Sequence, residues 1–347
     1  MLPGRGRAFL EDRKMNRQEP KTSVIICVYT ADRLKDIHEA VESVLAQTLK
    51  PHEMILAVDH NKQLYERLAE IYRDSIEIGR NSINLNQSPN LQAPIPIILV
   101  LNEGAQGLSE TRNVGIRAAS GEIIAFIDDD AVAEKDWLLY LTKPFEDERV
   151  VAVGGRTIPL WLNGRRPSWF AEELDWIVGG TYKGLPLNGN RIRNVAGGNA
   201  AFRKMGAEKA GLFRSETGRV GPTTGCGEEA EFCVRISRAL PEALIVYQEH
   251  ATIRHKVAGQ RTTWGYLWQR SYNEGFYKAK VEKLHQSAQQ TQKTLSTEDS
   301  YLRYLLSKSI PNRLARFYRR GNLRQTAAII VCIGATGVGY LVGKTRA

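Results

Sequence analysis

The sequence predicts an α/β fold in which a mostly parallel sheet is covered by helices on both faces. Five short apolar stretches have the length of buried strands, and they occupy residues 23–28, 54–58, 95–100, 123–127 and 150–154. Between them, apolar residues recur at helical spacing from Ile37 to Leu45, and a further helix is expected at about 109–119. Sheets of this kind bind ligands at the carboxyl ends of their strands, so polar residues there are the first candidates for a site.

Length and composition favour one large domain with appendages. The chain has 347 residues, of which 42% are hydrophobic, enough to bury a sizeable core. Residues before 22 form a polar lead-in without the apolar run of a signal peptide, and Met15 is a second candidate start. The Asn-, Ser- and Pro-rich stretch 75–95 is expected to be a loop insertion. The four cysteines lie far apart without a C-x-x-C pair, which favours a reducing, cytoplasmic compartment.

Positive charge is concentrated at the C-terminal end. The formal net charge is +10, yet residues 301–347 hold nine Lys or Arg and no Asp or Glu, so the remainder is close to neutral. Residues 301–324 mix Leu, Tyr and Phe with Arg and Lys, as an interfacial amphipathic segment does. Nucleic acid would favour stacking aromatic side chains within a folded groove. The tail therefore predicts a membrane partner and no nucleic acid.

Residues 325–343 form an uncharged run of nineteen residues between Arg324 and Lys344. As a helix, this run would span roughly 28 Å, close to the thickness of a hydrocarbon core of about 30 Å. Ala335, Gly339 and Gly343 recur at four-residue spacing, which is typical of helix contacts in membranes. We expect a helix that spans the membrane or lies on it. The alternative is a buried C-terminal helix.

Three consecutive aspartates, Asp128, Asp129 and Asp130, follow the apolar strand at 123–127. Adjacent carboxylates repel each other, and a divalent cation bound together with phosphate oxygens would neutralise them. Mg²⁺ and Mn²⁺ prefer such oxygen ligands. In a turn after the strand, Asp128 and Asp130 can point the same way while Asp129 points elsewhere. The alternative is an Asp-rich turn that caps the next helix.

Two common nucleotide-binding motifs are absent from the sequence. No G-x-G-x-x-G follows the strand at 23–28, which argues against a dinucleotide-binding oxidoreductase. No G-x-x-x-x-G-K-[ST] occurs either, which excludes the common nucleoside triphosphatases. A phosphate-binding site would therefore depend on a metal rather than on a glycine-rich loop.

Five motifs in order resemble those of family 2 glycosyltransferases of the GT-A fold, the fold of nucleotide-diphospho-sugar transferases. They are TSVIICVYTADR, MILAVDHN, GLSETRNVGIRAASGEIIAFIDDDA, GGNAAFRK and GCGEEAEFCVRI. The spacing of PSWFAEELDWIVGGTYKGLP and RNVAGGNAAFR, with the basic apolar tail, looks most like glucosyl-dolichyl phosphate glucuronosyltransferases and their bacterial relatives. The resemblance covers about residues 22–285.

The resemblance also implies an organisation of the chain. After the lead-in 1–21, the catalytic domain 22–285 would consist of a nucleotide-binding half, 22–154, and an acceptor-side half, 155–285. A basic amphipathic linker, 286–324, would lead to the membrane-associated helix, 325–343.

The residues implied to contact the nucleotide sugar are Val28, Tyr29, Thr30, Asp59, Arg112, Asn113, Asp128, Asp129, Gly198 and Asn199. The family often has an acidic pair that reads the base. Here Asp59 is followed by His60, so the residue that reads the base is open. A surface salt bridge is the alternative role for Arg112.

The metal ligands implied by the resemblance are Asp130, Asp128 and His255, with Asp130 foremost. The extra Asp129 leaves the register of the aspartates open, and a structural role is the alternative for His255. The catalytic base is expected to be Glu229, or Glu228 if the register is off by one. A positioned carboxylate can take the proton of an acceptor hydroxyl as the new bond forms.

The expected activity is therefore inverting, metal-dependent transfer of a sugar from a nucleotide-sugar donor to a lipid-linked saccharide, and the resemblance makes glucuronic acid the candidate sugar. The enzyme is expected at the cell membrane with its catalytic domain on the cytoplasmic side. A sugar nucleotidyltransferase is one alternative, although the residues CVYTADR lack the glycine-rich basic loop that such enzymes carry after the first strand. A catalytically inactive, membrane-tethered module is another.

Overall fold

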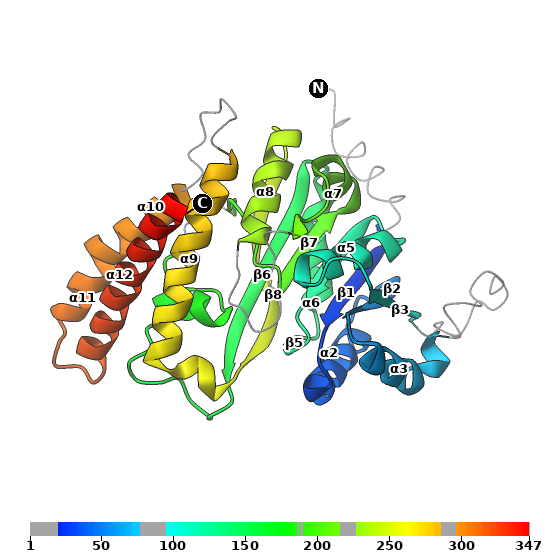
Figure 1. The fold of residues 1–347 in the computed structure, drawn as a ribbon, viewed down its shortest axis with the longest axis horizontal. Coiled ribbons are helices and arrows are strands. Elements are labelled where there is room, and N and C mark those ends of the chain that lie inside the picture. The colour runs from blue at the N-terminus through cyan, green and yellow to red at the C-terminus, as the bar shows by residue number, and fades with distance from the viewer. Residues whose placement is uncertain are drawn as a thin grey trace, which may run out of the picture.

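The computed structural model describes residues 20–76, 95–185, 187, 190–215, 227–285 and 296–346. Most of the N-terminal lead-in, most of the expected loop insertion and the beginning of the expected basic linker lie outside these residues. The described chain forms an eight-stranded sheet with the strand order β3-β2-β1-β4-β7-β6-β8-β5 (Figure 1). The strands are β1 (Thr22–Val28), β2 (Glu53–Asp59), β3 (Ile97–Asn102), β4 (Ile123–Ile127), β5 (Ala131–Ala133), β6 (Val150–Trp161), β7 (Asn199–Arg203) and β8 (Leu244–Val257).

The sheet is mixed rather than uniformly parallel. Its first four strands, β3 to β4 in spatial order, are parallel to one another, as the apolar runs predict. β7 then pairs antiparallel with both β4 and β6, and the short β5 pairs antiparallel with β8. All five strands predicted from the sequence are present, whereas β5, β7 and β8 were not anticipated.

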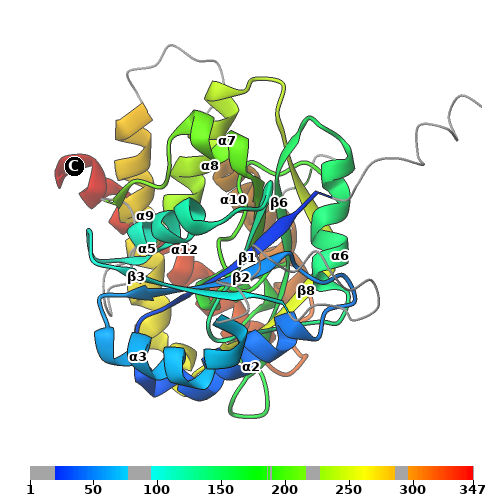
Figure 2. The same cartoon turned by 90° about the vertical axis from the view of Figure 1, so that its right-hand side faces the viewer.

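Helices cover both faces of the sheet. They are α2 (Leu34–Leu45), α3 (Lys62–Ile71), α5 (Leu108–Ala118), α6 (Trp137–Thr142), α7 (Lys204–Ala210), α8 (Glu228–Ala239), α9 (Trp264–His285), α10 (Ser296–Tyr304), α11 (Ile310–Leu314) and α12 (Asn322–Arg346). Short helical turns are η1 (Ala31–Arg33), η3 (Lys143–Glu146), η4 (Glu172–Val178), η6 (Gly259–Thr262) and η7 (Leu305–Ser309). Figure 2 shows α2 and α3 on one side of β1 to β3 and α5 on the other.

Alternation along β1 divides the core into two layers. Val24 and Ile26 face one layer, where α2 and α3 pack on the sheet, while Ile25 faces the layer under α5 and α8. On α2, Ile37, Ala40, Val41 and Val44 are buried at helical spacing. The parallel pairing of β1 with β2 and β4 places the carboxyl ends of these strands side by side, which is where the polar candidates lie.

A third apolar cluster lies beside the sheet and is built by the C-terminal helices. Phe170 and Leu174 pack there with Leu267 of α9, Leu305 of η7 and Ile329 of α12. In Figure 1, α12 runs along α9 on the side of the molecule away from α2 and α3. The C-terminal segment is therefore packed on the folded body over its described length.

Candidate functional site

The three aspartates after β4 separate into two directions. Single ligand atoms of Asp128, Asp130 and His255 all lie within 4.8 Å of one another, a group that can hold a metal ion. Asp129 turns toward η1, where Arg33 Nη1 donates to its Oδ1 at 2.8 Å. The structure thus brings together the three predicted metal ligands and places Asp129 outside them.

Strand pairing puts His255 beside the aspartates. β5 follows the aspartates directly, and Ala131 lies opposite His255 in β8. The N–H of Lys256 donates to the carbonyl of Asp130 at 2.9 Å, and His255 Nε2 lies 3.0 Å from Asp130 Oδ1. The unpredicted strands β5 and β8 are therefore the elements that assemble the group.

Positive side chains compensate the buried negative charge. Asp129 and Asp130 are buried, and Arg33 Nη1 lies 3.2 Å from Asp130 Oδ2. Burial alone would raise the pKa of Asp130, but the charges of His255 and Arg33 outweigh it and hold this pKa below its usual range. Burial raises the pKa of Asp129, and the neighbouring Asp130 adds to the rise. Asp130 is therefore the better anionic ligand of the two.

The donor set suits a divalent cation. Two carboxylates and an imidazole are ligands that Mn²⁺ and related hard or borderline ions accept. Within the described part of the chain, no hydrogen-bond partner is found for the buried His255 Nδ1. The ring is bounded by Gly179, where an added Cβ would lie 3.3 Å from His255 Cε1. The residues present thus fit a metal, which the His255 imidazole and the two carboxylates would hold.

The ends of β1 and β2 form the neighbouring part of the site. Val28, Tyr29, Asp59 and His60 line the same cavity as the aspartates. Asp59 accepts hydrogen bonds from the Asn102 side chain at 3.0 Å and from the Gly107 N–H at 3.1 Å, so it also fixes the loop before α5. His60 has a left-handed backbone conformation, with φ of 50°, and its Nε2 lies 2.9 Å from the carbonyl of Gly104.

Arg112 connects α5 to the two acidic candidates at the start of α8. Its Nη1 lies 3.1 Å from Glu229 Oε1 and 3.4 Å from Glu228 Oε1. Burial lowers the pKa of Arg112, but these two carboxylates outweigh it and hold the pKa above its usual value. The guanidinium also stacks on Phe213, 5.4 Å from the ring centroid. Arg112 is therefore a buried, fixed cation rather than a surface one.

Three residues named from the motifs lie outside the cavity lining. The Asn113 side chain donates to the Phe213 carbonyl at 2.8 Å and accepts from the Phe213 N–H at 2.9 Å. Asn199 accepts from Trp137 Nε1 at 2.8 Å and donates to the Ala251 carbonyl at 3.0 Å. Thr30 accepts from the Asp32 N–H and caps η1. These contacts hold the backbone around the cavity.

The adjacent glycines Gly197 and Gly198 allow the backbone to approach the charged groups. A Cβ added to Gly198 would overlap the Asp128 carboxylate, and one added to Gly197 would overlap Glu229 and Arg112. The N–H of Asp128 donates to the Gly198 carbonyl at 3.3 Å. Any larger residue at Gly198 would therefore have to displace Asp128.

Apart from Thr30, Asn113 and Asn199, the candidate residues line one cavity of about 1090 Å³. Its lining also contains residues that the sequence did not single out, among them Arg33, Arg261 and Trp176. Arg33 lies in the motif TADR, and Arg261 follows His255 by six residues. Neither position indicates in the sequence that the side chain lies near the aspartates after β4. C-terminal residues complete the lining, including Tyr301, Leu302, Ile333, Thr336 and Tyr340.

We expect Asp130→Asn to weaken Mn²⁺ binding at least about 10²-fold, because the amide keeps the shape of the side chain but removes its charge. Calorimetric titration with Mn²⁺ in the presence of a nucleoside diphosphate measures the change. The control is Asp147→Asn, because Asp147 follows η3 directly and its side chain is partly exposed. Thermal unfolding checks that both variants fold. Unchanged Mn²⁺ affinity in Asp130→Asn would exclude this metal role.

Gly198→Ala should lower Mn²⁺ affinity by at least about 10-fold, because its Cβ pushes the Asp128 carboxylate out of the group. Gly206→Ala in α7 is the matched control, since its Cβ would meet Val151 at an ordinary 3.6 Å. The same titration compares the two variants. Equal affinities would mean that Asp128 moves without consequence for the site.

Comparison with known proteins agrees with this geometry. Residues 23–211 match the family model for glycosyl transferase family 2. The chain is 31% identical over 327 residues to a glucosyl-dolichyl phosphate glucuronosyltransferase of Haloferax volcanii, covering 93% of this chain and 96% of the relative.

Two solved structures share the GT-A fold. A mannosyltransferase from Pyrobaculum calidifontis, in complex with GDP-Man and Mn²⁺, has a TM-score of 0.56 at 16% identity and covers 93% of this chain and 88% of its own. GalNAc-T7, solved with UDP, GalNAc and Mn²⁺, has a TM-score of 0.51 at 16% identity and covers 88% of this chain and 59% of its own. With the family model matching more than half of its length, this chain belongs to glycosyl transferase family 2.

Proposed function

We propose that this glycosyltransferase moves a glucuronic acid unit, with inversion, from a nucleotide sugar to a polyprenyl-linked saccharide at the cytoplasmic face of a membrane. The observation that carries the proposal is the placement of the Asp128, Asp130 and His255 group and the Glu229 carboxylate on one cavity. The similarity to the glucuronosyltransferase over nearly the whole of both chains supports the choice of sugar and acceptor.

The donor diphosphate would lie beside the metal-ligand group. Asp130, Asp128 and His255 would hold Mg²⁺ or Mn²⁺, which would stabilise the negative charge of the leaving diphosphate. Val28, Tyr29 and Asp59, at the ends of β1 and β2, would border the base. Several guanidinium groups, those of Arg33, Arg112 and Arg261, line the same cavity.

Glu229 is the better placed of the two candidate bases. The side chain of Glu228 is 5% exposed, whereas that of Glu229 is 19% exposed, and both contact Arg112. An acceptor hydroxyl entering the cavity would meet the more accessible carboxylate first. Glu229 would take the hydroxyl proton during a single displacement, and a single displacement inverts the anomeric configuration.

The C-terminal residues support a lipid-linked acceptor. α12 is long and apolar enough to cross a membrane, with a mean hydropathy of 1.9 over its best window. The same helix lines the cavity through Ile333, Thr336 and Tyr340. An acceptor held in the membrane would therefore approach the cavity from the side of the molecule that carries the apolar helix.

The donor and acceptor can be tested directly on the full-length protein. We expect a mass-spectrometric screen of nucleotide sugars to select a nucleotide-linked glucuronic acid, and we expect transfer to a polyprenyl phosphate-linked saccharide in vesicles. The same saccharide without its lipid is the control acceptor and should react at least about 10-fold more slowly. Selection of a neutral sugar would contradict the proposed donor, and preference for the soluble saccharide would contradict the proposed acceptor.

Glu229→Gln should lower turnover at least about 10²-fold with little change in donor binding, because loss of a general base acts on the transition state. Glu208→Gln, on the exposed face of α7, is the control. If Glu228→Gln produces the loss instead, the base is one residue earlier. If neither variant changes turnover, no carboxylate of this pair is the base.

A further inference from the structure

We propose that α12 attaches the enzyme to the membrane by lying in the plane of the bilayer surface rather than by crossing it, so that both ends of the helix stay on the catalytic side. The inference rests on the membrane acceptor proposed above and concerns the orientation of α12 relative to the bilayer. α12 has three faces: one packs against α9, one lines the cavity, and one is exposed and apolar.

The first face packs backbone to backbone against α9. A Cβ added to Gly339 would overlap the Tyr272 carbonyl, and one added to Gly275 would overlap the Thr336 carbonyl. At Gly343, an added Cβ would lie 2.7 Å from the Phe276 carbonyl. The small residues predicted to mediate helix contacts therefore make such a contact, but with a helix of the catalytic body.

The second face lines the cavity, and the third is exposed and apolar. Leu323, Ile330, Val338 and Leu341 are 56%, 55%, 46% and 67% exposed. Together with the exposed Ala327 and Gly334 they form the outward stripe of α12, defined as residues 323, 327, 330, 334, 338 and 341. The spacing of these positions keeps them on one side of the helix. No charged residue interrupts the stripe.

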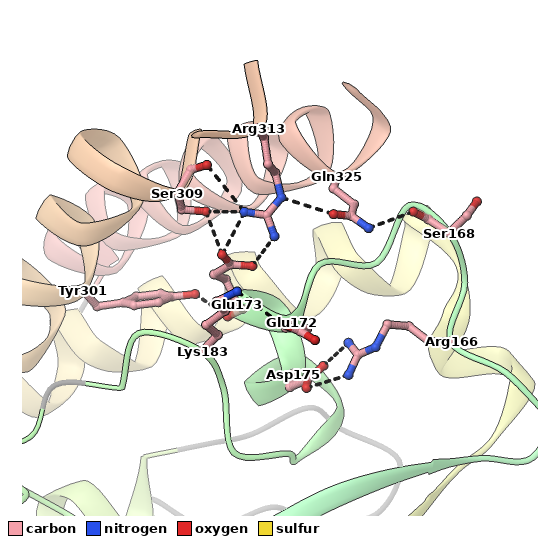
Figure 3. Close-up of polar contacts among 10 residues, drawn as sticks. All are labelled: Arg166, Ser168, Glu172, Glu173, Asp175, Lys183, Tyr301, Ser309, Arg313 and Gln325. Carbon is pink, nitrogen blue, oxygen red and sulfur yellow. Dashed lines mark hydrogen bonds and ion pairs between the residues drawn. The ribbon is translucent and has the colours of Figure 1, made fainter. Parts of the chain in front are cut away.

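Polar contacts fasten both ends of α12 to the catalytic body. Near the C-terminal end, Lys344 Nζ lies 2.6 Å from Glu282 Oε2, and the Tyr340 hydroxyl donates to the same oxygen at 2.5 Å. Near the N-terminal end, the Gln325 side chain donates to the Ser168 carbonyl at 3.1 Å (Figure 3). The helix is therefore held at each end by residues that precede it in the chain.

A buried ion pair strengthens the N-terminal attachment. The Arg313 guanidinium donates to both carboxylate oxygens of Glu173, at 2.8 and 2.6 Å, and Ser309 Oγ donates to one of them at 2.8 Å (Figure 3). Glu173 is almost fully buried. Breaking such a pair leaves an uncompensated buried charge, so release of α11 and α12 from η4 would be costly.

These attachments conflict with a spanning helix. α9 packs alongside α12. It carries four charged residues, Arg270, Glu274, Lys278 and Glu282. If α12 crossed the bilayer while packed as it is, these charged groups would be drawn to the depth of the hydrocarbon, where ionised side chains are strongly disfavoured. In the surface orientation, only the outward stripe needs to enter the lipid.

The residues next to the stripe favour an anionic bilayer as its partner. Phe317 and Tyr318 are 62% and 72% exposed in the connection before α12. Arg316, Arg319 and Arg320 are exposed in the same connection. Exposed aromatics beside clustered arginines are typical of interfacial segments. A second copy of this chain would bring the same positive charges together, which disfavours a dimer through this surface.

Protease protection in inverted membrane vesicles tests the orientation without any substrate, so its result is independent of the proposed acceptor. For this test, one protease-cleavable epitope is added before Met1 of the full chain and a second is added after Ala347. We expect protease outside the vesicles to remove both epitopes to the same extent. Protection of the C-terminal epitope until detergent is added, with cleavage of the N-terminal one, would establish a spanning helix and overturn the inference.

Substitution of the outward stripe tests the contact itself. The double variant Ile330→Glu/Leu341→Glu should bind vesicles of phosphatidylglycerol and phosphatidylethanolamine at least about 10-fold less than the unsubstituted chain. Met205→Glu, at an exposed position of α7, is the control and should bind normally. Normal binding by the double variant overturns the inference. Conversion of a dimer to a monomer without loss of vesicle binding also overturns it, because the stripe would then be a self-interface.

Discussion

Negative charge at the carboxyl end of β4 is the constraint on which the site depends. Asp129 and Asp130 can be buried there only if cations reach them, and Arg33 and His255 come from elements far away in sequence. Arg33 donates to Asp129 and also lies close to Asp130, while Asp128 and Asp130 form the metal-ligand group with His255. β5 and β8 are needed because their pairing places the imidazole beside Asp130. The mixed part of the sheet is therefore what completes the metal-ligand group.

The sequence predicted the strands that consist of continuous apolar runs. β1, β2 and β4 are continuous apolar runs because both of their faces are covered. β8 is long, carries polar and charged residues along its length, and pairs with β6 through a shift in register near Gly155. Such a strand lacks the apolar signal, and β7 has the sequence NAAFR, with only three apolar residues between Asn199 and Arg203. Both strands depend on neighbours that are remote in sequence.

The same distinction applies to the site. Motifs identified the residues that converge on the cavity, including Asp130, Glu229 and His255. They could not identify Arg33, because its partner Asp129 is 96 residues away. The position of a residue in a motif also did not show whether its side chain lines the cavity or holds the backbone around it. Asn199 stands next to Gly198, yet it holds Trp137 and the backbone around β6 and β8. The direction of a side chain was the missing information.

The third apolar cluster has a consequence for how the enzyme can be divided. Phe170 and Leu174 lie on the segment that leads into the cavity wall at Ile177 and Gly179, and they are covered by Leu305 and Ile329. A shortened version ending after α9 would expose this cluster and leave Glu173 without Arg313. The C-terminal helices thus belong to the same folding unit as the metal-ligand group. Conditions that preserve these helices would therefore also preserve the shape of the cavity wall at Ile177 and Gly179.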